Sequence, residues 1–349
     1  MKLLHTADVH LDSPMQSNLS PEQARRRRGE LQRTFSDMVE AGARQGVRAV
    51  LIAGDLFESS YPTAAALAAF LDLVSRHPQV DFLLLRGNHD RASLSLLSPP
   101  ENLKFFGQNE YTCYRYGQVA VYGCEKPDIP LPPLDKDSLN IVMLHGQAGR
   151  AAGEGLVDLR AFEHRHIDYL ALGHVHSYQS GPLPERGVWC YSGCPEGRGY
   201  DECGEKGYVL LEVADGRLTH TFVPSGARRR CHTVPIDLTG APDFAVVEKR
   251  VREAVAELPK EDLVKVVLQG TVGLEVLMDT ALLAEWLSEH FFAARVEDAL
   301  RLAVRAEDYR YDLSLRGEFV RTVLASELSE QDREQVILCG TRALNGEEI

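Results

Sequence analysis

The sequence predicts an α/β fold, and two patterns carry the prediction. Five short apolar runs of the kind that forms buried strands each end in Asp, Asn or His, usually beside Gly. Segments with the apolar spacing of helices lie between them. Strands that alternate with helices form layered α/β structures, in which ligands gather at the carboxyl ends of the strands. The 349 residues, 44% of them hydrophobic, suffice for one large domain and a smaller one.

The elements can be placed in chain order. The five apolar runs are 2–10, 48–57, 81–90, 139–146 and 168–177. A helix between the first two runs begins at the capping box formed by Ser20 and Gln23, with Pro21 at its first position, and ends before Gly46. A second helix is expected over 64–75. We expect the polar ends of the five runs to converge on one site made of Asp8, His10, Asp55, Asn88, His89, Asp90, His145, His174 and His176.

The residue types in this set favour a metal centre. Imidazole and carboxylate without thiolate suit manganese, iron or zinc better than calcium or magnesium. Two dications bound by two aspartates keep an excess of about two positive charges, which can bind a phosphate ester and hold a hydroxide. We therefore predict a dinuclear centre of two divalent ions, Mn²⁺ first and Fe or Zn as alternatives. Asp55, directly after Gly54, is the candidate for the bridging carboxylate.

The five clusters resemble the motifs of the calcineurin-like metallophosphoesterases. They stand here as Asp8-Val9-His10, Gly54-Asp55, Gly87-Asn88-His89-Asp90, His145-Gly146 and Gly173-His174-Val175-His176. The resemblance implies a two-layered β-sandwich core flanked by helices. It also implies one metal held by Asp8, His10, Asp55 and His176, and another held by Asp55, Asn88, His145 and His174. His89 would then be the catalytic acid beside the phosphate, and Asp90 would orient it.

Further stretches point to a subfamily. LLHTADVHLDSP, GDLFESSYPT, DYLALGHVHSYQ and YSGCPEGRGYDECGEKGYVLLEV resemble the bacterial SbcD-type and YhaO-like DNA repair exonucleases over roughly residues 1–225. Several nucleases of this group carry a phosphate-contacting histidine three residues after the bridging Asp, whereas this chain has Glu58. A carboxylate there would repel a phosphodiester unless it is protonated or turned away. Glu58 and Arg91 are the residues expected at the substrate.

These features predict a metal-dependent phosphodiesterase that hydrolyses DNA as an exonuclease or endonuclease in repair. One alternative is a small-molecule phosphoesterase acting on nucleotides or cyclic nucleotides, favoured by the acidic charge and by Glu58. Another is a non-catalytic subunit that tethers DNA. The metal identity, the polarity of digestion and the oligomeric state, a homodimer included, stay open.

The catalytic domain is expected to cover 1–226, followed by a small α/β capping domain over 231–312 and a helical hairpin over 313–349. Apolar spacing in the second region predicts a β-α-β-α-β order, and a purely structural appendage is the alternative to a cap. In nucleases of the resembled type such a hairpin binds the coiled coil of an SMC-like ABC ATPase. Phe319 and Val323 are the expected anchors, unless the two helices only pack on each other or on the cap.

Composition limits the partners and the location. The net charge of −13 argues against coating nucleic acid by charge alone, so DNA binding would need a local basic patch. The run Arg25 to Arg28 is either a solvated helix face or a contact with the DNA backbone. His5, inside the first strand, is either a core residue or a partner of a metal ligand. The chain has seven cysteines without CxxC spacing, which predicts reduced thiols. It has neither an apolar run of 18 residues nor a signal peptide, so we expect no membrane association and a cytoplasmic protein.

Overall fold

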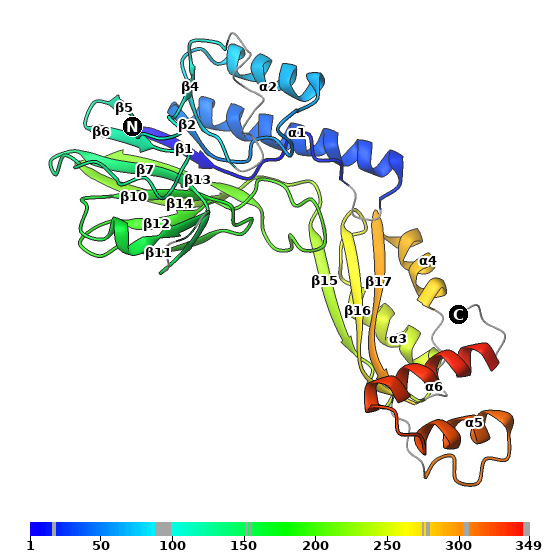
Figure 1. Ribbon diagram of the computed structural model, residues 1–349. Helices are drawn as coiled ribbons and strands as arrows, with labels where there is room; N and C mark the ends of the chain where they lie inside the picture. Colours follow the sequence, from blue (N-terminus) through cyan, green and yellow to red (C-terminus); the bar gives the residue numbers. More distant parts are fainter. Residues whose placement is uncertain are drawn as a thin grey trace. The chain divides into compact units, whose positions relative to one another are not determined.

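Figure 1 shows a computed structural model of the chain. It describes residues 1–15, 19–87, 99–150, 153, 155–273, 276, 280–302 and 307–344. The chain divides into two compact units, Met1–Cys231 and His232–Ile349. Within the described ranges the first unit holds two six-stranded sheets and a small two-stranded ladder, β8 (Gln147–Gly149) with β9 (Leu156–Asp158).

The first sheet carries three of the five predicted strands. Its members, in spatial order, are β14 (Arg217–Pro224), β13 (Gly207–Ala214), β1 (Lys2–Thr6), β2 (Val47–Ala53), β3 (Asp81–Leu85) and β4 (Leu103–Phe105). β1 to β4 run parallel, and β13 pairs antiparallel with β1. The carboxyl ends of β1, β2 and β3 therefore share one edge of this sheet.

The second sheet carries the other two predicted strands. Its members, in spatial order, are β11 (Gln179–Pro182), β12 (Val188–Tyr191), β10 (Tyr169–Gly173), β7 (Leu139–His145), β6 (Val119–Gly123) and β5 (Thr112–Tyr116). β12, β10, β7 and β6 run parallel. The five polar clusters thus come from two sheets, a division that the apolar runs themselves do not indicate.

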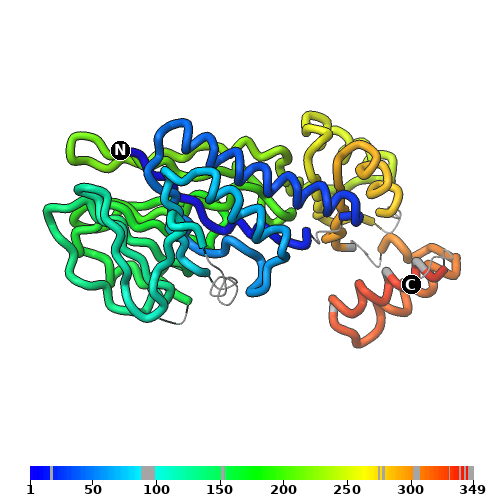
Figure 2. Tube along the Cα trace, turned by 90° about the horizontal axis from the view of Figure 1, so that it is seen from above, coloured from blue at the N-terminus to red at the C-terminus, as the bar shows by residue number. Residues whose placement is uncertain are grey.

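The two sheets stack face to face with helices outside them. Leu3 packs between the sheets, whereas its neighbour Leu4 packs toward α1 (Pro21–Arg44) and α2 (Ala64–Arg76). Figure 2 shows these two helices lying over the strands. Strands buried on both faces read as continuous apolar runs, which is why the sequence displays them so clearly. The predicted fold class, a two-layered sandwich flanked by helices, is confirmed.

The arginine run on α1 is split between solvent and core. Arg25 and Arg26 are exposed, but Arg27 is completely buried, so the description of the whole run as a solvated face is wrong for Arg27. Its guanidinium donates to Glu30 (2.7 Å), Glu196 (2.9 Å) and the carbonyl of Gly197 (2.5 Å). A buried arginine is stable only when such partners satisfy its charge and its donors.

Arg229 completes this buried ionic cluster from the segment that precedes the second unit. Its Nε and Nη2 donate to the carboxylate of Glu30 at 2.9 Å. The stretch 225–230, which has the composition of a linker, is therefore fixed at Arg229. Burial of Arg229 beside Glu30 ties the end of the first unit to α1.

The second unit has the predicted β-α-β-α-β order. Its elements are β15 (Cys231–Asp237), α3 (Phe244–Val255), β16 (Leu263–Val272), α4 (Thr280–His290) and β17 (Ala293–Leu302). The sheet order is β15-β16-β17, with β16 and β17 parallel. Val247 and Val251 of α3 and Leu287 of α4 belong to one apolar core with the sheet.

The predicted helical hairpin is present as α5 (Leu315–Leu324) and α6 (Glu330–Leu344). The hydroxyl of Ser329 accepts the N–H of Asp332 at 3.2 Å and so caps the start of α6. Val320 and Val323 pack with Ile337 in the hairpin's own core. The prediction that Val323 is an exposed anchor is therefore wrong, because its side chain is buried between the two helices.

Two further expectations concern thiols and membranes. All seven cysteines are free thiols, as predicted. Among the described residues, no helix combines the length and the apolar character that a bilayer crossing requires.

Candidate metal centre

Six of the nine predicted site residues lie at the carboxyl ends of four strands, in the part of the chain that the structure describes. Asp8 and His10 follow β1, Asp55 follows β2, His145 ends β7, and His174 and His176 follow β10. Ligand atoms of Asp8, His10 and His176 lie within 4.8 Å of one another, and so do those of Asp8, Asp55 and His145. Asp8 belongs to both groups. Asn88, His89, Asp90 and the proposed substrate residue Arg91 lie outside the described residues.

The backbone at these strand ends is unusual. Asp8, His10 and Asp55 have φ angles of 52°, 51° and 50°. Residues with a side chain rarely adopt this left-handed conformation, and such outliers cluster at functional sites. The N–H of Asp8 donates to the carbonyl of Gly54 (3.1 Å), and that of His10 to the carbonyl of Asp55 (3.0 Å). These bonds join the two loops and hold their side chains against one another.

Two motif glycines are required by close approach. A Cβ at Gly54 would overlap the Nδ1 of His145, and Gly54 also has a φ of 94°. A Cβ at Gly87 would overlap the carboxylate and backbone of Asp55. Gly54 therefore leaves room for His145, and Gly87 leaves room for Asp55, which is a steric reason for glycine at these two motif positions.

Polar contacts at both ring nitrogens fix the orientation of His145. Its Nδ1 lies 2.9 Å from the carbonyl of Ala53 and donates to it, and its Nε2 lies 3.3 Å from Oδ2 of Asp55. Burial disfavours the charged imidazole, but the hydrogen bond to Asp55 and the negative charge of Asp8 outweigh burial and raise the pKa of His145 to about 9. The metal-free site is therefore cationic at this imidazole.

His174 and His176 differ in their surroundings. Nδ1 of His176 lies 2.7 Å from Glu202, and the bond raises the pKa of His176 in spite of the opposing effect of burial. His174 donates its backbone N–H to Asp8 at 2.9 Å, and its ring lies 5.6 Å from that of His145, centroid to centroid. Its ring nitrogens join neither candidate ligand group, so its role as a metal ligand stays a prediction.

Two residues beside the site were not predicted. Glu202 accepts from His176, and Arg198 donates to Glu202 and forms an ion pair with Glu58. Both lie in the stretch GRGYDE between β12 and β13, which belongs to a segment quoted for the subfamily resemblance but matches none of the five metal-ligand motifs. Burial opposes ionisation of Glu202, but His176 and Arg198 keep its pKa well below the ordinary range. Such carboxylate partners are a usual accompaniment of metal-binding histidines.

His5 is a core residue. It is fully buried, and its Nδ1 lies 2.8 Å from the hydroxyl of Tyr169, which belongs to β10 of the facing sheet. Burial lowers the pKa of His5 to about 3. The alternative that places His5 beside a metal ligand is not what the structure shows, because the imidazole joins the two sheets instead.

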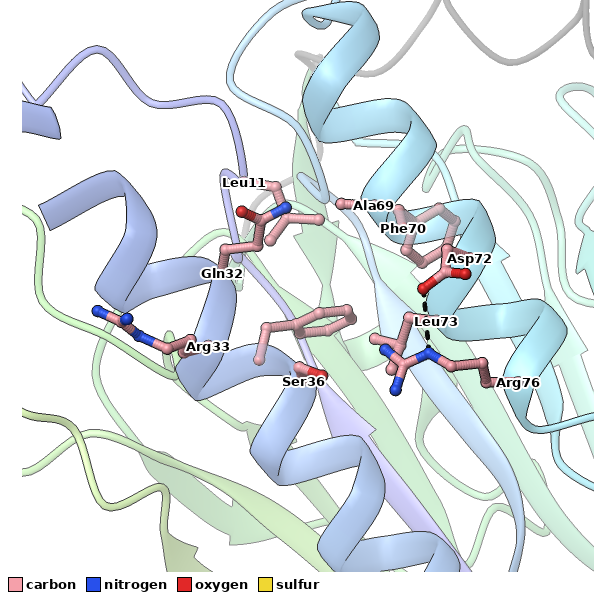
Figure 3. A pocket seen from close by; sticks show the side chains of 10 residues that line it. Leu11, Gln32, Arg33, Ser36, Ala69, Phe70, Asp72, Leu73 and Arg76 are labelled. Carbon is pink, nitrogen blue, oxygen red and sulfur yellow. Dashed lines mark hydrogen bonds and ion pairs between the residues drawn. The ribbon is translucent and has the colours of Figure 1, made fainter. Parts of the chain in front are cut away.

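An arginine-lined groove runs between α1 and α2. One hollow is lined by Arg25 and Arg28, and the next by Arg33 and Arg76; both include Leu11, which directly follows His10. Figure 3 shows Arg33 and Arg76 on opposite sides of the second hollow. Arg76 is paired with Asp72 at 3.0 Å, whereas no ion pair to Arg25 or Arg33 occurs among the described residues. This groove is a basic surface on an acidic protein.

The donor set fits a pair of divalent ions. The described candidates combine two aspartates with histidines, all at least partly enclosed, and contain no thiolate. Calcium and magnesium prefer all-oxygen sites, so manganese, iron or zinc suit these donors better.

The first half of the chain is similar in sequence to known metallophosphoesterases. The sequence model of the calcineurin-like phosphoesterase family matches residues 1–178. The metallophosphoesterase YhaO of Bacillus subtilis is 27% identical over 78% of this chain and 72% of its own length. The DNA double-strand break repair protein Mre11 of Methanopyrus kandleri is 26% identical over 80% of this chain and 65% of its own length. A crystal structure of a dimetal phosphatase from Danio rerio covers 65% of the chain and 97% of its own, at 12% identity and a TM-score of 0.47.

Proposed function

Since the chain belongs to the calcineurin-like phosphoesterase family of hydrolases, we propose that it is a two-metal phosphodiesterase acting on DNA. One observation carries the metal-dependent chemistry: two groups of ligand atoms that share Asp8 lie side by side at the meeting edges of the two sheets. Shared or adjacent ligand groups of this kind suit a pair of ions that act on one phosphate.

The residues have separate tasks in such a reaction. Asp8 and Asp55 supply the negative charge that holds divalent ions, and we retain Asp55 as the proposed bridging ligand. Divalent ions held by these residues would lower the pKa of a bound water and would neutralise charge on the phosphoryl oxygens. His145, fixed through Nδ1, presents Nε2 to the site. His89, by the family resemblance, donates a proton to the leaving oxygen, and Asp90 orients it.

DNA is the substrate that we favour over a small phosphoester. The relative from Methanopyrus kandleri is named for DNA double-strand break repair, although this chain spans only 65% of its length. The groove beside the site supplies what an acidic protein needs for DNA, namely Arg25 and Arg33 with no ion pair in the described structure. A nucleotide-sized substrate is the second candidate, and Glu58 beside the site is the observation that favours it.

A charge-reversal experiment separates the two candidates. Changing Arg25, Arg28 and Arg33 to Glu should weaken binding of linear duplex DNA and reduce the salt dependence of binding, because phosphate contacts release counterions. Manganese-dependent hydrolysis of a small chromogenic phosphodiester should stay at the wild-type rate. If DNA cleavage is also unchanged, or if the wild-type protein cleaves only nucleotides, the DNA proposal fails.

The metal and acid roles are tested in parallel. Wild-type protein should retain up to two equivalents of Mn²⁺ after desalting, and less than one equivalent at saturation would contradict a dinuclear site. Asp55→Ala should lose metal, whereas His89→Ala should keep both ions and lose about 10²- to 10⁴-fold in turnover. Equal loss of metal in the two variants would refute the assignment of His89 as acid.

We also propose that the hairpin binds an SMC-like ATPase in the cytoplasm, a location that the free thiols support. Leu313, just before α5, is 96% exposed, and Leu315, at its start, is 73% exposed. These residues replace Phe319 and Val323, which pack in the core of the hairpin, as the proposed anchors. Leu313→Glu with Leu315→Glu should abolish co-purification with the ATPase and leave phosphodiester hydrolysis intact. The matched control is Leu282→Glu, which changes an exposed leucine of α4. Undiminished complex formation by the double variant would rule out Leu313 and Leu315 as anchors.

A further inference from the structure

Three charged side chains form a continuous bridge behind the candidate metal ligands. Glu58 follows β2, while Arg198 and Glu202 lie between β12 and β13. Arg198 forms an ion pair with Glu58 and donates to Oε1 of Glu202 through Nη2 (2.8 Å) and Nε (3.1 Å). The backbone N–H of Arg198 also donates to Oε2 of Glu202 at 2.7 Å. We call these three residues the carboxylate–arginine bridge.

Each end of the carboxylate–arginine bridge contacts one histidine of the same ligand group. Oε2 of Glu58 lies 3.1 Å from Nδ1 of His10, and Oε1 of Glu202 lies 2.7 Å from Nδ1 of His176. The two imidazole rings are neighbours, with centroids 5.4 Å apart. The contact of His176 is a hydrogen bond and that of His10 is within ion-pair distance, so both rings turn Nδ1 toward a carboxylate, although they follow strands of different sheets.

This arrangement has a chemical consequence. A neutral imidazole carries one proton, and a carboxylate beside Nδ1 keeps the proton on that nitrogen. The lone pair is then on Nε2, which is the form that ligates a metal. A carboxylate partner also raises the basicity of the ligating nitrogen.

From these contacts we infer that Glu58 and Glu202 are positioning residues for His10 and His176, and that Arg198 couples the two carboxylates. The inference rests on the proposed metal-binding function and extends it to residues outside the ligand set. Glu58 acts through His10 in this assignment and does not contact substrate.

Charge explains why the arginine is needed. Asp8, Asp55, Glu58 and Glu202 carry four negative charges, which two dications would cancel, leaving nothing to attract a phosphate. The guanidinium of Arg198 restores one positive charge. Because Arg198 also holds Glu58 against His10, the carboxylate that would repel a phosphodiester is neutralised where it stands.

The test compares metal affinity and histidine tautomers. Glu58→Ala and Arg198→Met should each lower the calorimetric affinity for Mn²⁺ about 10- to 100-fold. In metal-free protein with ¹⁵N-labelled histidine, Glu58→Ala should move the proton of His10 from Nδ1 toward Nε2. Glu58→Gln keeps an acceptor oxygen and should restore the wild-type tautomer without restoring the full affinity.

The matched control is Glu185→Ala, which removes a carboxylate 2.6 Å from Nδ1 of His166, a histidine outside the site. It should change neither manganese affinity nor the tautomer of His10. Affinity within twofold of wild type, or an unchanged His10 tautomer in folded Glu58→Ala, would overturn the inference. If Arg198→Met does not fold, Glu58→Ala decides alone, because its side chain is already 29% exposed.

Failure of the inference and failure of the proposed function are distinguishable. A wild-type protein that binds no Mn²⁺ would remove the proposed function. The tautomer of His10 is measured without metal, and it tests the positioning role whatever the metal result.

Discussion

Arg27→Met should be among the most destabilising single substitutions in the first unit. The guanidinium is completely buried and bonds Glu30, Glu196 and the carbonyl of Gly197. After the substitution Glu30 keeps Arg229. Glu196 keeps only the hydroxyl of Thr34, at 2.7 Å, among the contacts described. The change therefore leaves one buried carboxylate without a cationic partner.

The magnitude follows from that orphaned charge. Removing one partner of a buried ion pair costs about 3–5 kcal/mol, because the remaining charge has lost its compensation in a dry environment. Adding Glu196→Gln removes the orphaned charge and should recover a large part of this loss. Arg26 contacts the same Glu30 from the solvent side, and its side chain is 63% exposed. Arg26→Met should therefore lower the free energy of unfolding by less than about 1 kcal/mol.

Urea unfolding of the metal-free protein measures these differences. The chain has two tryptophans, Trp189 in the first unit and Trp286 in the second, so a Trp286→Phe background makes fluorescence report the first unit alone. A loss below about 1 kcal/mol for Arg27→Met, or no recovery in the double variant, would refute the argument from the buried charge.

Three further predictions concern the site and its surroundings. The pKa of His145 is about 9 without metal, so binding of a metal to His145 must displace a proton. The affinity for Mn²⁺ should therefore fall up to about tenfold per pH unit from pH 9 to 7. Calorimetry in two buffers should detect the released proton, and its absence would contradict this prediction. The pKa of His5 is about 3 in the folded protein and near 6.5 in the unfolded chain, so the contribution of neutral His5 to stability is complete above pH 6.5 and is lost as the pH falls, by about 1.4 kcal/mol per pH unit. The free energy of unfolding of His5→Gln should therefore fall less steeply than that of wild type between pH 6.5 and 5.0. Equal slopes would refute this prediction. Gly87→Ala should abolish manganese binding by displacing Asp55, whereas Gly29→Ala, with open space at its Cβ, should raise the melting temperature; retained binding in Gly87→Ala would show that the steric argument fails.

The parts of the fold that could be predicted are those with a local signal. Parallel strands buried on both faces give continuous apolar runs, and α1 begins at a capping box that the structure contains. Strands such as β4, with three residues, and β11, with two exposed residues followed by Gly and Pro, have no such signal. The division into two sheets is also absent from the runs, because it depends on which strands pair and not on how apolar each one is.

The burial of Arg27 likewise has no local signal that distinguishes Arg27 from the neighbouring arginines. Four consecutive arginines look alike in the sequence, and only one faces the interior of the protein. Its partner Glu196 is 169 residues away along the chain, so no local window contains the pair. A buried charge is a tertiary feature that helix periodicity alone does not reveal.

The candidate site shows a similar limit in Glu58. Its position three residues after Asp55 suggests repulsion of a phosphate, and that expectation would hold for an isolated carboxylate. The structure sets Glu58 between His10 and Arg198, a residue 140 positions later in the chain. The effect of Glu58 on a bound anion therefore depends on Arg198, which lies outside the five metal-ligand motifs.

Three consecutive residues join the stability of the fold to the metal centre. Glu196 and the carbonyl of Gly197 are held by Arg27, and the next residue, Arg198, holds Glu58 and Glu202. A displacement of Glu196 should reach the backbone of Arg198, because only Gly197 separates the two residues, and Arg198 contacts both histidine-bound carboxylates. The buried ionic cluster on α1 therefore helps to position Arg198 and, with it, the carboxylate–arginine bridge. On this reasoning Arg27→Met should weaken manganese binding as well as stability, whereas Arg26→Met, on the solvent side of the same helix, should leave manganese binding unchanged and lower stability by less than about 1 kcal/mol.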